Sequence, residues 1–332
     1  MTNKIYSTGK PNTLNKPLLM KRIESVIDSG VYTDGVFREE LETLIKNYLG
    51  VEHCLLVTNH AEGIELSLKG LFKTYLDSYE NYNYWEILVS EFTPRSTLAG
   101  IINAGFLPKT CRVDEDYCIS FPDIERKINS KTIGIIAANL FGNVANTLKL
   151  DYTQDLPIIY DSYHALGCYD ELQDVYCGNL GECEVFPFIS SNPVSGVGGF
   201  ITTYNTDLYL RLLDIQKNEV SEFDTVLNLT NFENIQEIQS HYFDIQVWYR
   251  KFLPKKVKLQ EKNGYFSNFS YIIIEVDDRD KLIQALEERN IYVPVPKDLY
   301  NVPDKVLTLP AGMDLQKEDI KYICTQIGEC LK

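Results

Sequence analysis

Paired cysteines and clustered histidines are missing from this sequence. Its 332 residues include eight cysteines, none of which forms a C-x-x-C pair, and its four histidines are scattered along the chain. A zinc site of the common Cys/His type is therefore not indicated. We expect the cysteines to be reduced residues of the core, as in a protein of a reducing compartment.

Long hydrophobic runs and an excess of positive charge are missing as well. No run approaches the roughly 20 apolar residues of a membrane span, and the polar start, MTNKIYSTGKPNTLNKP, has no apolar signal segment. Asp and Glu outnumber Lys and Arg by 47 to 32, which gives a formal net charge of −15. Clustered Lys and Arg bind phosphates, so we expect no nucleic-acid or membrane partner. A cytoplasmic location is predicted.

The sequence does contain a regular alternation of short apolar runs and amphipathic segments. Helices are predicted for residues 18–29, 36–49, 61–71, 95–104 and 122–128. Strands are predicted for residues 53–57, 86–89, 110–113, 132–138 and 156–160. This order predicts an α/β fold with a mostly parallel sheet that is covered on both faces.

The pattern changes after about residue 205. One more helix is predicted for residues 208–216, whereas residues 223–248 are aromatic and polar without clear strand signals. Further on, strands are predicted for 271–276 and 306–309, and helices for 280–289 and 317–330. We therefore predict a large domain at 1–250, which includes a loose N-terminal arm, and a small C-terminal α+β domain at 251–332.

Polar residues follow the predicted strands at 58–60, 90–94, 139–143 and 161–164. Ligands of α/β sheets bind beyond the carboxyl ends of the strands, so the site is predicted at this edge. His60, Glu62, Asp161 and His164 together suggest an acidic pocket that contains histidine. Such a pocket suits acid/base chemistry or a metal ion. The favoured interpretation is a remodelled, inert cleft.

Six blocks of sequence stand in a characteristic order. The first three are SGVYTDGVFREELETLIKNYLGVEHCLLVTNHAEGIELSLKGL, VSEFTPRSTLAGIINAGFLPKTCRVDED and NSKTIGIIAANLFGNVAN. The next three are IIYDSYHALG, GNLGECEVFPFISSNPVSGVGGFITT and VLTLPAGMDLQKEDIKYI. In order and spacing these blocks resemble the DegT/DnrJ/EryC1/StrS family of nucleotide-sugar aminotransferases, which belongs to fold-type I.

The resemblance implies an aspartate-aminotransferase-like large domain with a seven-stranded sheet and a small C-terminal domain. It also implies a homodimer with the site at the subunit interface. The family's cofactor is pyridoxal phosphate (PLP), which such enzymes hold through a lysine imine, a carboxylate at the ring nitrogen, a phosphate cup and a stacked aromatic ring. The positions implied for cofactor binding are Asn59, His60, Ala61, Pro94, Asp161, His164 and Asn192.

Asp161 matches the carboxylate at the ring nitrogen, and His164 stands where the family has a glutamine near the ring hydroxyl. Asn192 stands at the position of the lysine, and no lysine occurs from residue 185 to residue 203. Because an asparagine cannot form an imine, we expect that PLP is not bound covalently. Asp161 and His164 are the candidate catalytic residues that remain.

The phosphate and stacking positions also depart from the family. His60 replaces a glycine, Ala61 replaces a hydroxyl donor, and Glu62 adds a negative charge where a phosphate would bind. Pro94 stands where the stacking aromatic residue is expected, and Pro187 replaces a serine that contacts the phosphate. These changes predict weak binding of the cofactor, since each lost donor removes about 1 kcal/mol or more of binding free energy.

The favoured hypothesis is a degenerate homologue of the aminotransferases in nucleotide-sugar or surface-polysaccharide metabolism. It would form a homodimer, or a heterodimer with an active paralogue, and its ligand would be a nucleotide sugar or amino sugar. One alternative is a sugar-modifying enzyme that uses His164, His60 or Asp161 as acid or base. Another is a transaminase or dehydratase that binds PLP or pyridoxamine phosphate noncovalently, as a 3-dehydratase branch of the family does with histidine at the lysine position.

Overall fold

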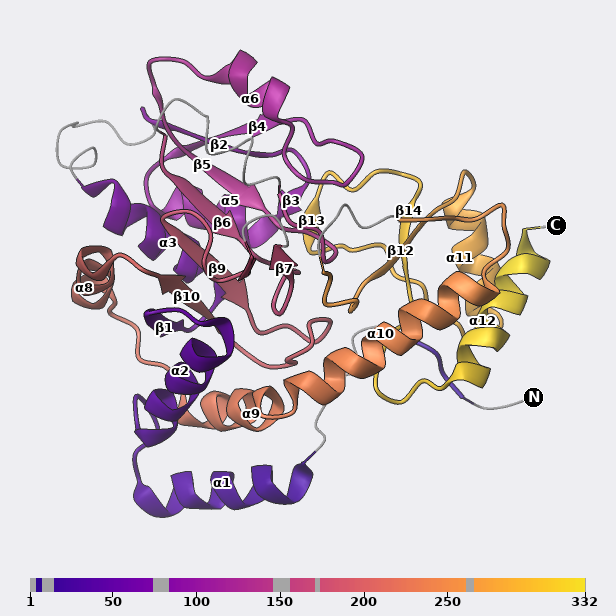
Figure 1. Cartoon of the computed structure of the whole chain (residues 1–332), viewed down its shortest axis with the longest axis horizontal. Helices are drawn as coiled ribbons and strands as arrows, with labels where there is room; N and C mark the ends of the chain where they lie inside the picture. Colours follow the sequence, from indigo (N-terminus) through magenta and orange to yellow (C-terminus); the bar gives the residue numbers. More distant parts are fainter. Residues whose placement is uncertain are drawn as a thin grey trace.

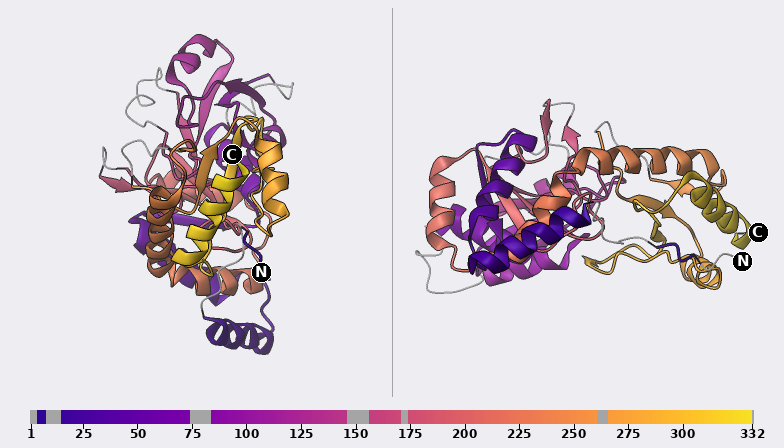
Figure 2. Two further views of the ribbon diagram at one scale, coloured as in Figure 1. Left: turned by 90° about the vertical axis from the view of Figure 1, so that its right-hand side faces the viewer. Right: turned by 90° about the horizontal axis from the view of Figure 1, so that it is seen from below.

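The computed structural model describes residues 4–7, 15–73, 84–145, 156–170, 174–260 and 266–331. A large part built on a central sheet lies beside a smaller part that contains the C-terminal helix, and the long helix α10 runs from one to the other (Figure 1). The smaller part has a hydrophobic core of its own. Figure 2 shows the two parts from two further directions, side by side in its right-hand view.

The helices are α1 (Lys16–Ser29), α2 (Val36–Leu49), α3 (His60–Leu71), α5 (Arg95–Asn103), α6 (Phe121–Lys127), α8 (Thr206–Ile215), α9 (Glu222–Phe232), α10 (Ile235–Phe252), α11 (Arg279–Glu287) and α12 (Lys317–Cys330). The strands of the large part are β1 (His53–Val57), β2 (Glu86–Ser90), β3 (Thr93–Pro94), β4 (Leu107–Cys111), β5 (Thr132–Ala138), β6 (Ile158–Asp161), β7 (Tyr169–Asp170), β8 (Val175–Tyr176), β9 (Cys183–Pro187) and β10 (Gly199–Thr203). Those of the smaller part are β11 (Lys258–Leu259), β12 (Ile272–Glu275), β13 (Leu299–Tyr300) and β14 (Val306–Leu309).

The central sheet has the strand order β1-β10-β9-β6-β5-β2-β4. Its strands run parallel except β10, which is antiparallel to both neighbours, β1 and β9. Neighbouring residues of a strand point to opposite faces. Accordingly Ile135 of β5 joins the core formed with α2, whereas Ile136 joins the core formed with α3 and α5. Burial of both faces confirms the predicted α/β fold with a mostly parallel sheet.

Two glycines bring α3 close to the sheet and to α5. A Cβ atom at Gly63 would lie 2.6 Å from Val185 Cγ1 of β9, and one at Gly100 would lie 2.7 Å from the backbone oxygen of Ala61. Larger residues at these positions would push the elements apart. The close packing places the first turns of α3 and α5 side by side beyond the ends of β1 and β2.

The smaller part has a sheet of order β11-β12-β14, which packs with α10, α11 and α12 around its own hydrophobic core. A second link to the large part is the pairing of β13 with β3, in which Leu299 lies opposite Pro94. Helix α10 continues through the boundary near residue 250 that the sequence suggests. That boundary stays a prediction.

Two segments of the sequence-based prediction illustrate where it departs from the structure. The strand predicted at 110–113 is wrong in its bounds, because β4 covers Leu107–Cys111 and includes Pro108. Proline is tolerated there because β4 is the edge strand of the sheet. Residues 223–248, which gave no clear signal, lie almost entirely in the helices α9 and α10. Within the described ranges, no helix has both the length and the apolar character needed to cross a membrane.

Candidate functional site

Asp161 is the last residue of β6 and is fully buried. Its Oδ1 lies 2.9 Å from Nε2 of His60, and its Oδ2 accepts a hydrogen bond from the hydroxyl of Thr97. These two partners come from the first turns of α3 and α5. Both oxygens of the carboxylate are therefore bound by side chains of the chain itself.

His60 is the first residue of α3 and exposes 5% of its surface. Its Nδ1 lies 2.8 Å from Oγ of Ser96, and its ring meets the ring of Tyr163 edge to face, with the centroids 5.0 Å apart. With Asp161 on Nε2, the imidazole is held by a contact at each nitrogen and by an aromatic neighbour. These contacts fix the orientation of the ring.

Glu62 brings a negative charge to the start of α3. Its Oε2 accepts hydrogen bonds from the backbone N–H and the hydroxyl of Thr58, at 2.7 and 2.6 Å, and its Oε1 accepts one from Asn218 at 2.8 Å. The side chain of Asn59 caps the helix by accepting the N–H of Glu62 at 3.0 Å. A carboxylate is stabilised at a helix N-terminus, so the implied phosphate position already contains an anion. Ala61 adds no side-chain donor there.

Asn192 lies in the turn after β9 and is buried. Its Nδ2 donates hydrogen bonds to the backbone oxygens of Tyr163, at 2.9 Å, and of Pro187, at 3.2 Å. The side chain amide therefore ties this turn to the segment after β6. Among the described residues, Oδ1 of Asn192 has no hydrogen-bond partner.

His164 is fully buried among aromatic rings. Its ring centroid lies 3.9 Å from that of Tyr271 and 5.3 Å from that of Phe141. Its Nδ1 accepts the backbone N–H of Phe141 at 3.3 Å, and its Nε2 lies 3.9 Å from Oδ2 of Asp298. His164 thus packs between the large part and a carboxylate of the smaller part.

Pro94 is buried at the junction of the two parts. It belongs to β3, pairs with Leu299 of β13, and is the N-cap residue of α5. The next residue, Arg95, donates its backbone N–H to the backbone oxygen of Asp298 at 2.9 Å. The smaller part is therefore hydrogen-bonded to the start of α5, immediately before Ser96.

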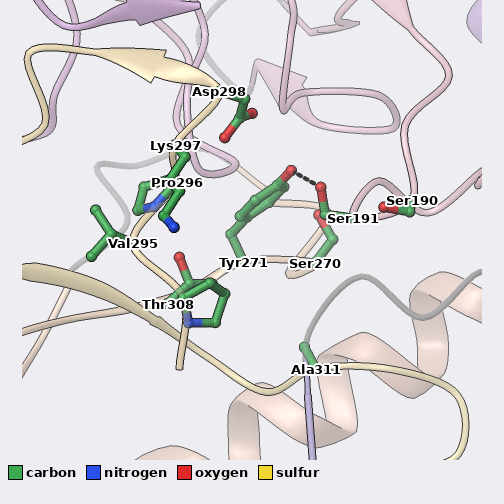
Figure 3. A pocket seen from close by; sticks show the side chains of 11 residues that line it. Ser190, Ser191, Ser270, Tyr271, Val295, Pro296, Lys297, Asp298, Thr308 and Ala311 are labelled. Atoms are coloured by element: carbon green, nitrogen blue, oxygen red, sulfur yellow. Dashed lines mark hydrogen bonds between the residues drawn. The ribbon is translucent and has the colours of Figure 1, made fainter. Parts of the chain in front are cut away.

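A cavity of about 360 Å³ opens between the turn after β9 and the smaller part (Figure 3). Its polar lining comprises Ser190, Ser191, Ser270, Tyr271, Lys297, Asp298 and Thr308. The hydroxyls of Tyr271 and Ser191 are hydrogen-bonded to each other, as the dashed line in Figure 3 marks. A concave site with a few convergent polar groups is typical of a small-molecule pocket.

The titratable groups at and beside this cavity have raised pKa values. Burial raises the pKa of Asp298, although a hydrogen bond from Tyr163 opposes the shift. Burial also raises the pKa of Tyr163, and the nearby Asp298 carboxylate adds to it. The pKa of Tyr271 is raised well above its ordinary value by burial. At neutral pH both phenols therefore remain protonated and able to donate hydrogen bonds.

The structure joins only some of the residues that the sequence suggested as one pocket. His60 contacts Asp161, whereas Glu62 contacts Thr58 and Asn218, and His164 lies near Asp298. Within the described part of the chain, no group of three or more His, Cys, Asp and Glu side chains is placed to hold a metal ion.

Three contributing residues were missed by the sequence reasoning. Ser96 and Thr97 lie two and three residues after the 90–94 segment, so the strand-end rule, extended by one helical turn, finds them. Asp298 gave no such signal, because it reaches the site through the pairing of β13 with β3, which joins distant segments.

The family assignment follows from a sequence comparison. The model of the DegT/DnrJ/EryC1/StrS aminotransferase family matches residues 15–240. The chain belongs to this family. The match includes Asp161, His60, Asn192 and all strands of the central sheet.

Several relatives of this family member are known. GDP-perosamine synthase of Vibrio cholerae is 26% identical, with 82% of this chain and 79% of that protein aligned. The dTDP-4-amino-4,6-dideoxy-D-glucose transaminase of Escherichia coli is 24% identical, over 97% of this chain and 98% of that one. Among solved structures, DesI in the presence of its TDP-sugar product has a TM-score of 0.89 at 20% identity, covering 99% of this chain and 93% of that one. The structural likeness supports the fold.

Proposed function

We propose that this family member does not transaminate and serves nucleotide-sugar metabolism as a ligand-binding or partner subunit. The observation that carries the proposal is the contact between His60 and Asp161, 2.9 Å from Nε2 to Oδ1. In the family this carboxylate holds the ring nitrogen of PLP, which supplies an electron sink when bound. Here an imidazole of the chain occupies that oxygen, and Thr97 occupies the other.

The residues present do not fit PLP at two further points. Glu62 places a carboxylate against the Thr58 N–H and hydroxyl, so a phosphate would meet like charge at the start of α3. Asn192 has no amine, and its side chain is engaged by the backbone oxygens of Tyr163 and Pro187. Ring, phosphate and imine positions are thus each taken by the chain's own groups.

The cavity beside Asp298 supports a ligand-binding role. It is lined by several hydroxyls and by one group of each charge, Lys297 and Asp298. Hydroxyl and carboxylate groups suit the hydroxyls and amine of an amino sugar, because each can accept a hydrogen bond from them. One relative is named for a dTDP-linked dideoxyamino sugar and DesI was solved with its TDP-sugar product, so a nucleotide sugar or amino sugar is the proposed ligand.

An exposed apolar surface on and around α1 supports a partner subunit. Helix α1 lies at one extremity of the molecule, against α9 (Figure 2). Large apolar side chains exposed by 38 to 67% on α1, α9, the α1–α2 connection and the first residue of α2 are Met20, Ile27, Val31, Tyr32, Val36 and Phe223. Apolar side chains gathered in this way mark protein interfaces. A second copy or a paralogue of this chain is the proposed occupant.

The test is to titrate the purified chain with PLP and with pyridoxamine phosphate, by calorimetry and visible absorption. An active transaminase of the family, handled in parallel, is the positive control. We expect no heat of binding and no absorption band of a protein Schiff base. Stoichiometric binding of either cofactor would overturn the proposal. Light scattering of the same preparation then measures whether the chain pairs with itself.

A further inference from the structure

Ser96, His60 and Asp161 form a continuous chain of hydrogen bonds. Oγ of Ser96 lies 2.8 Å from Nδ1 of His60, and Nε2 of His60 lies 2.9 Å from Oδ1 of Asp161. The second carboxylate oxygen of Asp161 accepts a hydrogen bond from the hydroxyl of Thr97. A hydroxyl, an imidazole and a carboxylate thus stand in series.

The direction of each hydrogen bond follows from the chemistry of the groups. An ionised carboxylate only accepts, so Asp161 selects the tautomer of His60 that carries its proton on Nε2. Nδ1 then has a free lone pair, and the hydroxyl of Ser96 donates to it. The imidazole is therefore oriented to remove the proton from Ser96.

These are the roles of nucleophile, general base and orienting acid in acyl transfer, which are recognised by geometry rather than by sequence position. We propose that Ser96 is the nucleophile of a serine-esterase site, and that its substrate is a carboxylic ester. The proposal rests on the proposed function in one respect, since His60 must remain on Asp161.

The reaction balances without any added cofactor. Oγ of Ser96 bonds to the carbonyl carbon of the ester, and the hydroxyl proton passes to Nδ1 of His60. The bond from that carbon to the alcohol oxygen breaks, and the alcohol leaves with the proton from Nδ1. A water molecule then attacks the acyl-serine with His60 as base, which releases the carboxylic acid and restores Ser96.

The surroundings of Ser96 suit this role. Ser96 is half-buried, whereas His60 and Asp161 are buried, so the nucleophile is the accessible end of the series. Ser96 lies in the first turn of α5, which has no side-chain cap. The N–H of Arg95 is donated to Asp298, so the N–H groups of Ser96 and Thr97, together with the helix dipole, are left to stabilise an oxyanion that forms beside this turn.

The ring of Tyr163 helps to hold the base. It meets His60 edge to face, and its hydroxyl is hydrogen-bonded to Asp298. The close approach of α3 to α5 at Gly100 fixes the separation of Ser96 from His60. Preorganisation of this kind is what a nucleophile and its base require.

The test is to treat the full chain with a fluorophosphonate probe and to locate the modified residue by mass spectrometry. We expect labelling at Ser96 and turnover of p-nitrophenyl acetate, both lost in Ser96→Ala and unchanged in Ser130→Ala, which removes an exposed serine. His60→Ala and Asp161→Asn are expected to slow the labelling by roughly 100-fold or more. Asp161→Asn retains the shape of the side chain and serves if His60→Ala does not fold.

The inference is overturned if wild-type Ser96 is unlabelled, or if labelling is equally fast in Asp161→Asn. A wild-type chain that reacts with neither the probe nor PLP refutes the esterase proposal and leaves the proposed function unaffected. A chain that binds PLP refutes the proposed function, whatever the probe shows. The two failures are therefore distinguishable.

Discussion

Nε2 of His60 lies 2.9 Å from Oδ1 of Asp161, and both side chains are buried. A buried carboxylate is costly without partners, and His60 supplies one of them. The contact occupies the carboxylate oxygen that, in our proposal, would otherwise meet a cofactor ring. It also holds the imidazole with Nδ1 2.8 Å from Oγ of Ser96, so both of our proposals depend on this pair of residues.

Replacement of His60 by alanine should leave a hole the size of the ring. We expect the change to lower the free energy of unfolding by about 2 kcal/mol or more, because two hydrogen bonds are lost and Asp161 loses a partner. Added imidazole should bind in the hole and restore part of the loss, as measured by thermal unfolding. His53→Ala, which removes a more exposed histidine, should gain nothing from imidazole. No effect of imidazole on His60→Ala would contradict the prediction.

Restoring the lysine alone should not restore cofactor binding. In Asn192→Lys, His60 still covers Asp161, and the turn loses the hydrogen bonds to Tyr163 and Pro187, so we expect a loss of about 1–3 kcal/mol in stability. The double variant Asn192→Lys/His60→Gly frees the carboxylate and should gain a visible Schiff-base band at high PLP concentration, since Glu62 still opposes the phosphate. An equal band in the single variant would show that His60 is not the obstacle.

Glu184 makes the stability depend on pH. Burial raises its pKa from 4.5 to about 7, and hydrogen bonds from Ser162, Gly178 and Leu180 only partly oppose the shift. Between these two values the unfolded chain has released the proton while the folded chain retains it. The free energy of unfolding should therefore fall as pH rises from 4.5 to 7, by up to about 3 kcal/mol from this group.

The measurement for Glu184 is denaturant unfolding at a series of pH values. Glu184→Gln keeps the shape and removes the titration, so its curve should be flatter across this interval. Glu182→Gln, which changes an exposed carboxyl two residues earlier, should follow the wild type. A wild-type stability that rises over the interval with the same slope in Glu184→Gln would refute the assignment.

Gly100 is expected to resist substitution. A Cβ atom there would lie 2.7 Å from the backbone oxygen of Ala61 and 2.7 Å from Cβ of Ile64, so Gly100→Ala should cost about 1–3 kcal/mol. It should also slow the labelling of Ser96 by the probe. Gly70→Ala, whose Cβ would meet the ends of the Leu208 and Leu212 side chains at 3.0 Å, is the milder control. Similar losses in both variants would argue against a special packing role for Gly100.

Much of the fold could be predicted from the sequence, because apolar periodicity is local. The helix at 36–49 and the strand at 132–138 have the predicted bounds. The edge strand β4 was misplaced, since Pro108 and Lys109 interrupt its apolar pattern. Helices α9 and α10 gave a mixed signal because much of their buried surface is polar or aromatic, as with Asn228 and Tyr242.

The candidate site was less accessible to sequence reasoning. The position of Asp161 at a strand end could be predicted, since it depends on the sheet alone. Its contact with His60, and that of His60 with Ser96, depend on how closely α3 approaches α5 and on which way one ring turns. Those are properties of packing between segments far apart in the chain, and a single sequence does not reveal them.

The hydrogen bond from the Arg95 N–H to the backbone oxygen of Asp298 couples the cavity segment to the start of α5. Residues 294–298 line the cavity on one side. The same segment contacts the start of α5 through the backbone oxygen of Asp298, and the next residue, Leu299, pairs with Pro94. A ligand that displaces this segment is expected to displace the first turn of α5 as well, which contains Ser96. Ligand binding in the cavity is therefore expected to change the position of Ser96.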